Sequence, residues 1–94
     1  MRDAKFEWDD RKAAANHARH GIAFETARKV FKDPFGVDEP DDRANYGEDR
    51  FTFIGMADGR LLFVAYTMRD SRIRIISARG AEPYEHRLYH EKSG

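Results

Sequence analysis

The sequence predicts an α+β domain in which an antiparallel sheet is packed by helices, in the element order β-α-α-β-β-β-α. Two patterns support this prediction. Apolar residues recur at helical spacing only in the first third of the chain, and alternating or β-branched runs fill the second half. A length of 94 residues leaves room for one hydrophobic core, so residues 1–94 are expected to form a single domain.

The first third of the chain contains clear helix start and stop signals. Residues 5–8 (Lys-Phe-Glu-Trp) alternate between polar and apolar, which predicts a short first strand. Asp9 is a favourable N-cap for an alanine-rich helix over Arg11–His20, and Gly21 can adopt the left-handed conformation that ends a helix. Helical spacing of apolar residues over Phe24–Lys32 predicts a second helix.

Strand patterns dominate the second half. Phe35–Asp49 is acidic and has little periodicity, which predicts a long surface loop with a brief strand near Phe35–Val37. Three strands are then expected, at Arg50–Ala57, Arg60–Met68 and Arg72–Ala78. Asp58-Gly59 is a strong hairpin signal between the first two, and Glu82-Pro83 opens a last helix because proline is tolerated at the first helical position.

The zero net charge hides a segregation of charge along the chain. Residues 1–49 hold nine basic and twelve acidic residues, whereas residues 50–79 hold six arginines and two aspartates. Seven of the acidic residues fall within Asp33–Asp49. We therefore expect a basic surface on the strands and a strongly acidic loop elsewhere. Such a basic surface suits a polyanion, although a requirement for solubility would produce the same pattern.

Composition argues against several classes of protein. There are no cysteines, which excludes disulfides and thiolate metal sites. No apolar run approaches the ~20 residues that span a bilayer, and the first residues lack a signal-peptide core, so a cytoplasmic protein is expected. His17 and His20 lie three residues apart on the first helix, but no acidic residue or cysteine stands at ligand spacing. Neither a metal nor a cofactor is expected.

The segment Arg72–Tyr89 holds the side chains best suited to chemistry on a phosphate. Alternation places one set of side chains of its strand on the outward face: Arg72, Arg74, Ile76 and Ala78. The other set takes the core face: Ile73, Ile75, Ser77 and Arg79. Arg79 lies at the strand end, where a bulge or turn could direct it to either side. Arg50 and Arg60 enter the same sheet. Guanidinium groups favour phosphate, but these arginines could instead solubilise the sheet and pair with the acidic loop.

The last helix carries candidate acid–base groups. Glu85 and Tyr89 are neighbours at i, i+4, and His86 points about a third of a turn away. Metal-free RNA cleavage needs a base for the 2′-hydroxyl, an acid for the 5′-oxygen and cations for the phosphorane charge. Glu85 or His86 could be base or acid, or both could be surface residues. Tyr66 shares parity with core residues, which indicates a core tyrosine, but its phenol could also hold a nucleotide.

Four ordered motifs run through the chain: Phe6-Glu7-Trp8-Asp9, Lys12–Asn16, His20-Gly21-Ile22 before Phe24-Glu25 and Ala27, and Arg72–Arg79. Together they resemble the BrnT family, the toxin components of type II toxin–antitoxin operons, over about Lys5 to Tyr89. The resemblance implies a RelE/ParE-like fold and a ribonuclease that arrests translation. It also implies a BrnA-like antitoxin with a ribbon-helix-helix DNA-binding region, so that operator DNA is contacted only through the antitoxin.

The resemblance also implies a set of site residues. The best-matching positions are Arg72, Arg74, Arg79, Glu85 and Tyr89. Two features depart from the family. Members often carry further arginines after the strand and in the helix, where this chain has only Arg87. A serine or threonine often caps the second helix, where Ala23 stands here and cannot cap it.

The leading hypothesis is a metal-independent endoribonuclease toxin. Its expected catalytic residues are Arg72, Arg74, Arg79, Glu85 and His86, and its expected RNA-binding residues are Arg50, Arg60, Tyr66 and Tyr89. The second hypothesis, favoured by the fewer arginines, is a non-catalytic antitoxin-binding or operon-regulating protein. The third is a ParE-like gyrase poison, because a fold does not determine its target. Aromatic residues expected at the sheet edge also allow a homodimer within the complex.

Overall fold

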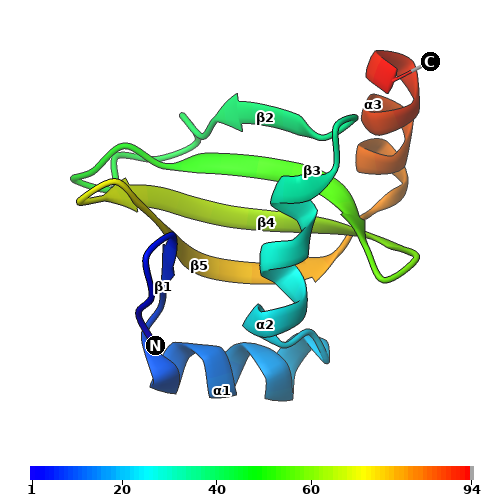
Figure 1. Cartoon of the computed structure of the whole chain (residues 1–94). Coiled ribbons are helices and arrows are strands. Elements are labelled where there is room, and N and C mark those ends of the chain that lie inside the picture. The colour runs from blue at the N-terminus through cyan, green and yellow to red at the C-terminus, as the bar shows by residue number, and fades with distance from the viewer. Residues whose placement is uncertain (94) are drawn as a thin grey trace.

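Five strands form one sheet, with helices on both of its faces, in the computed structural model, which describes residues 1–93 (Figure 1). The elements are β1 (Phe6–Glu7), α1 (Asp10–His20), α2 (Phe24–Ala27), the 3₁₀ helix η1 (Arg28–Lys32), β2 (Val37–Pro40), β3 (Phe51–Ala57), β4 (Arg60–Arg69), β5 (Arg72–Gly80) and α3 (Pro83–Ser93). The predicted α+β class is confirmed.

The two edge strands differ from the prediction. The sheet order is β1-β5-β4-β3-β2, and β1 runs parallel to β5, with Phe6 opposite Ile73. The sheet is therefore mixed and not wholly antiparallel. β2 begins at Val37 and runs antiparallel to β3, inside the predicted acidic loop and beyond the brief strand expected at 35–37. β1 pairs with a strand far away in sequence, and β2 pairs with the next strand across the irregular residues 41–50, and neither pairing is encoded by a local pattern.

Where the local signals are strong, the predicted elements are confirmed. The Asp9 carboxylate accepts hydrogen bonds from the backbone N–H groups of Arg11 (2.9 Å) and Lys12 (3.1 Å) and so caps α1. Gly21 ends α1 with a left-handed φ of 71°. The β3–β4 hairpin turns at Asp58 and Gly59, whose φ angles of 50° and 79° fit a tight two-residue turn.

The second helix is shorter than predicted. α2 ends at Ala27 and the chain continues as the 3₁₀ helix η1, where a single helix to Lys32 was expected. Ala23 occupies the N-cap position and makes no side-chain capping bond, as its methyl group requires. The missing cap fits the short length of α2, because a single helical turn has little stability of its own.

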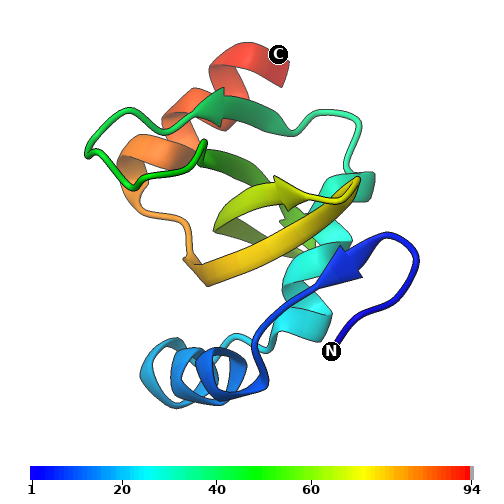
Figure 2. The ribbon, with the colours of Figure 1, turned by 90° about the vertical axis from the view of Figure 1, so that its left-hand side faces the viewer.

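The helices divide between the two faces of the sheet (Figures 1 and 2). α2 and η1 lie over one face and, together with α1 along the β5 edge of the sheet, enclose the main core, which includes Phe24, Val30, Val64 and Ile75. On the opposite face, which we call the α3 face, α3 packs against β2 and β3 at one corner. A smaller cluster there joins Tyr89 to Ile54, Val37 and Leu61. The rest of the α3 face carries the polar side chains described below.

Asn16 completes the outer edge of β5 where β1 ends. Its side-chain nitrogen donates to the carbonyls of Ala78 (2.8 Å) and Ile22 (3.0 Å), and its oxygen accepts the Ala78 N–H (3.1 Å). β1 pairs only with the start of β5, at Ile73 and Arg74. The buried amide of Asn16 therefore does for Ala78 what a neighbouring strand would do, since it satisfies both its donor and its acceptor.

Replacing Asn16 with leucine should destabilise the protein strongly. The substitution leaves a buried N–H and two buried carbonyls without partners, and each such group costs about 1–3 kcal/mol. We expect a loss on the order of 3 kcal/mol in urea unfolding followed by circular dichroism. Ala15→Gln, on the exposed side of the same helix, should change stability by less than about 0.5 kcal/mol. Equal urea midpoints for the two variants would contradict this role.

Candidate active site

A β-bulge determines which β5 side chains reach the α3 face. Ala65 pairs with Ser77 but Tyr66 pairs with Ile75, so Ile76 is the extra residue on β5. The bulge reverses the alternation for the rest of the strand. Ala78 is buried in the main core, and Arg79, opposite Phe63, lies on the α3 face. The predicted outward face of Ala78 was therefore wrong, and the side of Arg79, which the sequence left open, is decided by the bulge. The predicted faces of Arg72 and Arg74 agree with the core position of Ile75.

Arg79 and Glu85 form a bidentate ion pair between β5 and α3. Arg79 Nη1 and Nη2 each lie 2.8 Å from one Glu85 carboxylate oxygen, and Nη1 also donates to the Gly80 carbonyl at 3.1 Å. The guanidinium carbon lies 4.3 Å from the centre of the Phe63 ring. The pair is half enclosed, because the Glu85 side chain is 9% exposed and that of Arg79 28%. Two parallel bonds fix the orientation of the guanidinium plane.

Glu85 also stabilises the start of α3. Its Oε1 accepts the Glu82 backbone N–H at 2.8 Å, the reciprocal half of a capping box. Burial raises the pKa of Glu85, but the hydrogen bonds from Arg79 and the Glu82 N–H outweigh it and leave the pKa below its ordinary value. The hydrogen bonds to Glu85 also raise the pKa of Arg79. At neutral pH the site therefore contains an ionised carboxylate and a guanidinium held in place by it.

A second arginine cluster lies on the α3 face near β1. Arg74 Nη1 lies 2.6 Å from the Glu7 carboxylate, which is 8% exposed. Arg69 Nη1 lies 3.9 Å from the same Glu7 oxygen. Arg72 donates from Nε to the Asp3 carbonyl at 2.7 Å. The predicted catalytic arginines therefore occupy one face but two separate clusters, with Arg72 and Arg74 at the β1 end and Arg79 beside α3.

Arg43, which the sequence did not single out, joins the Arg79 cluster. Its guanidinium donates to both oxygens of Asp41, from Nε at 2.8 Å and from Nη2 at 2.9 Å, and its carbon lies 5.9 Å from the Phe63 ring centre. A cleft of about 290 Å³ opens between this segment and α3, lined by Arg43, Asp41, Phe63, Tyr84 and Glu85, among others. The one sequence signal was that Arg43 is the single base among the seven acids of residues 33–49.

Asp41 is the buried half of that second bidentate pair. Its side chain is 3% exposed, whereas Arg43 is 65% exposed. Tyr46 donates its hydroxyl to the same carboxylate at 3.3 Å. The hydrogen bonds from Arg43 outweigh burial and lower the pKa of Asp41 to about 2. An ionised, enclosed carboxylate therefore holds an exposed guanidinium at the rim of the cleft.

Three predicted RNA-binding residues lie away from this cleft. Tyr66 is on the opposite face, buried against Phe31, and donates its hydroxyl to Asp38 at 2.7 Å. Burial and this bond raise the pKa of Tyr66, so the phenol is a structural donor. Arg50 lies 4.2 Å over the Tyr46 ring and pairs with Glu48 at 3.0 Å. Arg60 begins β4 and is exposed, with its guanidinium beside the backbone of Gly80.

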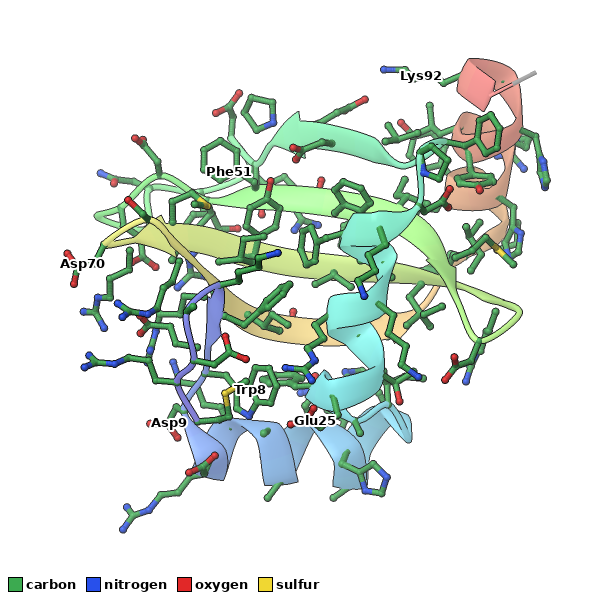
Figure 3. All side chains as sticks on the ribbon, in the orientation of Figure 1. Trp8, Asp9, Glu25, Phe51, Asp70 and Lys92 are labelled. Carbon is green, nitrogen blue, oxygen red and sulfur yellow. The ribbon has the colours of Figure 1, made fainter. Side chains whose placement is uncertain are left out.

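The predicted groups of α3 point in different directions. Tyr89 is buried and donates its hydroxyl to Asp33 at 2.7 Å, and this bond, helped by burial, raises the pKa of the phenol to about 12. His86 is exposed, and its ring stacks on His90 at a centroid distance of 6.4 Å. Lys92, near the outer end of α3, reaches towards β2 and pairs with Glu39 at 3.0 Å (Figure 3). Among the predicted groups of α3, Glu85 contacts an arginine of the strand, Arg79.

A separate cavity, with several basic side chains in its lining, lies on the other side of the molecule. It measures about 480 Å³ and is lined by Lys5, Phe6, Arg28, Lys29 and Lys32, among others. Arg28 is already paired with Asp3 and Glu25, and Lys29 with Asp58. Within residues 1–93 no cluster of His, Asp or Glu could hold a metal ion, and no helix is long and apolar enough to cross a membrane.

Replacing Glu85 with glutamine tests the importance of the Arg79 pair for stability. Glutamine can still accept the Glu82 N–H, but it loses its charge and one of its two acceptor oxygens. We expect a loss of about 2 kcal/mol in urea unfolding, the scale of a hydrogen bond to a charged group. Glu82→Gln is the matched control, because Glu82 is 68% exposed and 3.3 Å from Arg79. It should cost less than about 0.5 kcal/mol, and an equal loss for both variants would contradict the assignment.

The Asp41–Arg43 pair should respond to acid at low pH. Because the pKa of Asp41 falls from about 3.9 in the unfolded chain to about 2 when folded, the pair stabilises fully above pH ~4. That contribution is lost as the pH falls through about 2. Carbon-detected NMR titration should place the Asp41 midpoint near 2, and Arg43→Gln should move it upwards. An unchanged midpoint in the variant would mean that Arg43 does not hold this carboxylate.

The comparison with protein families identifies the family of the chain. The model of the family "Ribonuclease toxin, BrnT, of type II toxin-antitoxin system" matches residues 8–85 of the 94-residue chain, a range that contains Arg43, Arg79 and Glu85. No curated protein matches the sequence. Because the match covers most of the chain, the protein belongs to the BrnT family of ribonuclease toxins from type II toxin–antitoxin systems.

Proposed function

We propose that this BrnT-family protein is a metal-independent endoribonuclease that arrests translation by cleaving RNA. The observation that supports this most is the Arg79 guanidinium, held by two bonds to Glu85 over Phe63 at one end of the α3 face. A positively charged donor held in a fixed orientation is what a pentacoordinate phosphorane needs, because no reorganisation is required as its charge develops. Arg72 and Arg74 lie on the same face and extend the positive surface towards β1.

The proposed reaction is an attack of the RNA 2′-oxygen on the adjacent phosphorus. The bond between the 2′-oxygen and phosphorus forms as the bond between phosphorus and the 5′-oxygen breaks. The products are a 2′,3′-cyclic phosphate and a 5′-hydroxyl. A base takes the proton of the 2′-hydroxyl and an acid supplies one to the leaving oxygen. Glu85 is the proposed base, since it is an ionised carboxylate beside the Arg79 guanidinium that would hold the phosphate. His86, exposed one residue further on, is the proposed acid.

In this proposal a BrnA-like, ribbon-helix-helix antitoxin binds the toxin in the cytoplasm and blocks RNA access. Family membership supports an antitoxin partner, because type II systems pair a protein toxin with a protein antitoxin. Operator DNA would be bound through the antitoxin and not by the α3 face. The arginines of that face would remain available for RNA once the antitoxin is removed.

A second candidate function is favoured by one observation. Arg74 and Arg79 are each paired with a carboxylate that is less than a tenth exposed, Glu7 and Glu85 respectively. Paired arginines attract phosphate less strongly, which would suit a protein that binds its antitoxin and regulates the operon without cleaving RNA. The two functions differ in what happens to RNA when the chain is present alone.

The test is incubation of the purified chain with total RNA in EDTA. The expected products are fragments that end in 2′,3′-cyclic phosphate. Arg79→Ala should slow cleavage by about 10²–10³-fold, the usual cost of losing a transition-state donor, and should abolish growth arrest. Arg79→Lys should also be impaired, because an ammonium group cannot reproduce the bidentate geometry.

Arg11→Ala is the control for Arg79, because Arg11 is exposed on α1, which lies along the β5 edge of the sheet, away from the corner where α3 packs (Figure 1). It should cleave like the wild type, and urea unfolding should confirm that all variants are folded. Full activity of a folded Arg79→Ala protein would remove Arg79 from the site. Intact RNA in every lane would favour the non-catalytic function.

A further inference from the structure

We propose that Arg43 binds a substrate phosphate, and that with Arg79 it forms a two-arginine clamp over Phe63 for single-stranded RNA. The inference rests on the proposed function for the identity of the polyanion. It goes further by adding a residue from the acidic segment to the site. The buried Asp41 acts in this scheme as a positioning residue for Arg43.

The side chains of Arg43 and Arg79 approach the same aromatic ring. Arg43 comes from the segment after β2 and Arg79 from β5, yet their guanidinium carbons lie 5.9 and 4.3 Å from the centre of the same Phe63 ring. Phe63 and Glu85 both line the cleft of about 290 Å³, and Arg43 stands at its rim. Two guanidinium groups this close repel each other unless anions hold them in place, and each has a carboxylate partner here.

The two side chains of the Asp41–Arg43 pair are exposed to very different degrees. An ion pair made only for stability gains little when one partner is in water. Here the Asp41 side chain is 3% exposed while that of Arg43 is 65% exposed, so the buried partner is the carboxylate that holds the arginine. Asp41 also accepts the Arg43 backbone N–H at 3.3 Å and the Tyr46 hydroxyl, which restrict its own movement. This arrangement presents an oriented cation to solvent.

The Asp41 carboxylate uses only some of the N–H donors of Arg43. A guanidinium has five N–H groups, and the bonds to Asp41 use only Nε and Nη2. Tyr46 also lies within reach of this guanidinium, but Nη1 takes no part in the two bonds to Asp41 and can donate to a phosphate oxygen in the cleft. Tyr84, 60% exposed and lining the same cleft, offers an aromatic surface for a neighbouring base. A phosphate with an adjacent unpaired base describes single-stranded RNA more closely than a free anion.

The experiment measures binding separately from cleavage. A short fluorescent 2′-O-methyl RNA, which lacks the attacking hydroxyl, is titrated with the full chain at several salt concentrations. Each phosphate contact contributes about 0.7 to the slope of log affinity against log salt for single strands. Arg43→Gln, which keeps a donor for Asp41, should weaken binding by about three- to tenfold and reduce the slope by about 0.7. Arg43→Lys should keep the slope but bind less tightly.

Two more variants distinguish a phosphate ligand from a structural residue. Asp41→Asn keeps the charge of Arg43 and removes the carboxylate that competes with phosphate for it, so the slope should be retained. Arg19→Ala, an exposed arginine on α1, should match the wild type in both affinity and slope. Urea unfolding of each variant checks the fold. An unchanged slope in folded Arg43→Gln, or no RNA binding by the wild type, would overturn the clamp. Binding by the wild type without cleavage of ordinary RNA would overturn the proposed function and leave the clamp standing.

Discussion

The ion pair between Arg79 and Glu85 is the interaction on which the α3 face depends. It connects β5 to the first turn of α3, and the same Glu85 oxygen that meets Arg79 also caps the helix through the Glu82 N–H. The position of α3 and the orientation of the guanidinium are therefore set by one carboxylate. The second anchor of α3 is Tyr89, one helical turn further on, whose hydroxyl meets Asp33. With both contacts in place, α3 covers a corner of the sheet and leaves the rest of the α3 face open.

The acidic segment of residues 33–49 is mainly a set of anchors for side chains from other parts of the fold. The Asp33 carboxylate accepts the Met56 N–H and the Tyr89 hydroxyl, and Asp38 accepts the Tyr66 hydroxyl. Asp41 holds Arg43, and Glu39 pairs with Lys92. Charge that is segregated along the sequence is thus interleaved in space. This explains why the prediction of an acidic loop standing apart from a basic sheet was too simple.

The sequence predicted the parts of the fold that depend on neighbouring residues. The Asp9 cap, the left-handed Gly21 and the Asp58-Gly59 turn are local interactions, and each forms as expected. The parts it did not predict depend on distant residues. The parallel pairing of β1 depends on a strand far away in the chain, and β2 pairs with β3 across the irregular residues 41–50. The bulge at Ile76 matters most for the candidate site, because one inserted residue directs Arg79 to the α3 face.

The same distinction applies to the site. Arg79 and Glu85 were found because they stand close together in a segment rich in groups for phosphate chemistry. Arg43 was not, because its relation to Phe63 exists only after β2 has paired with β3. Tyr66 was correctly suspected of being a core residue from its parity alone. Spacing within one element can therefore identify candidate groups, but it cannot show which groups from different elements meet.

The distribution of carboxylates suggests a division of work along the α3 face. Beside α3 the guanidinium groups of Arg43 and Arg79 each have a carboxylate partner. Arg79 also meets Glu82 at 3.3 Å, and Glu39 and Asp42 line the same cleft, so this end has no excess of positive charge. At the β1 end Arg74 and Arg69 both approach the Glu7 carboxylate, and Arg72 donates to the backbone carbonyl of Asp3. Net charge draws a polyanion, whereas fixed orientation stabilises charge that develops during a reaction. In the proposed function, the β1 end therefore supplies affinity for RNA, and the α3 end holds the phosphate at which the chemistry takes place. Such a separation favours catalysis, because donors that bind the ground state weakly can bind the transition state better.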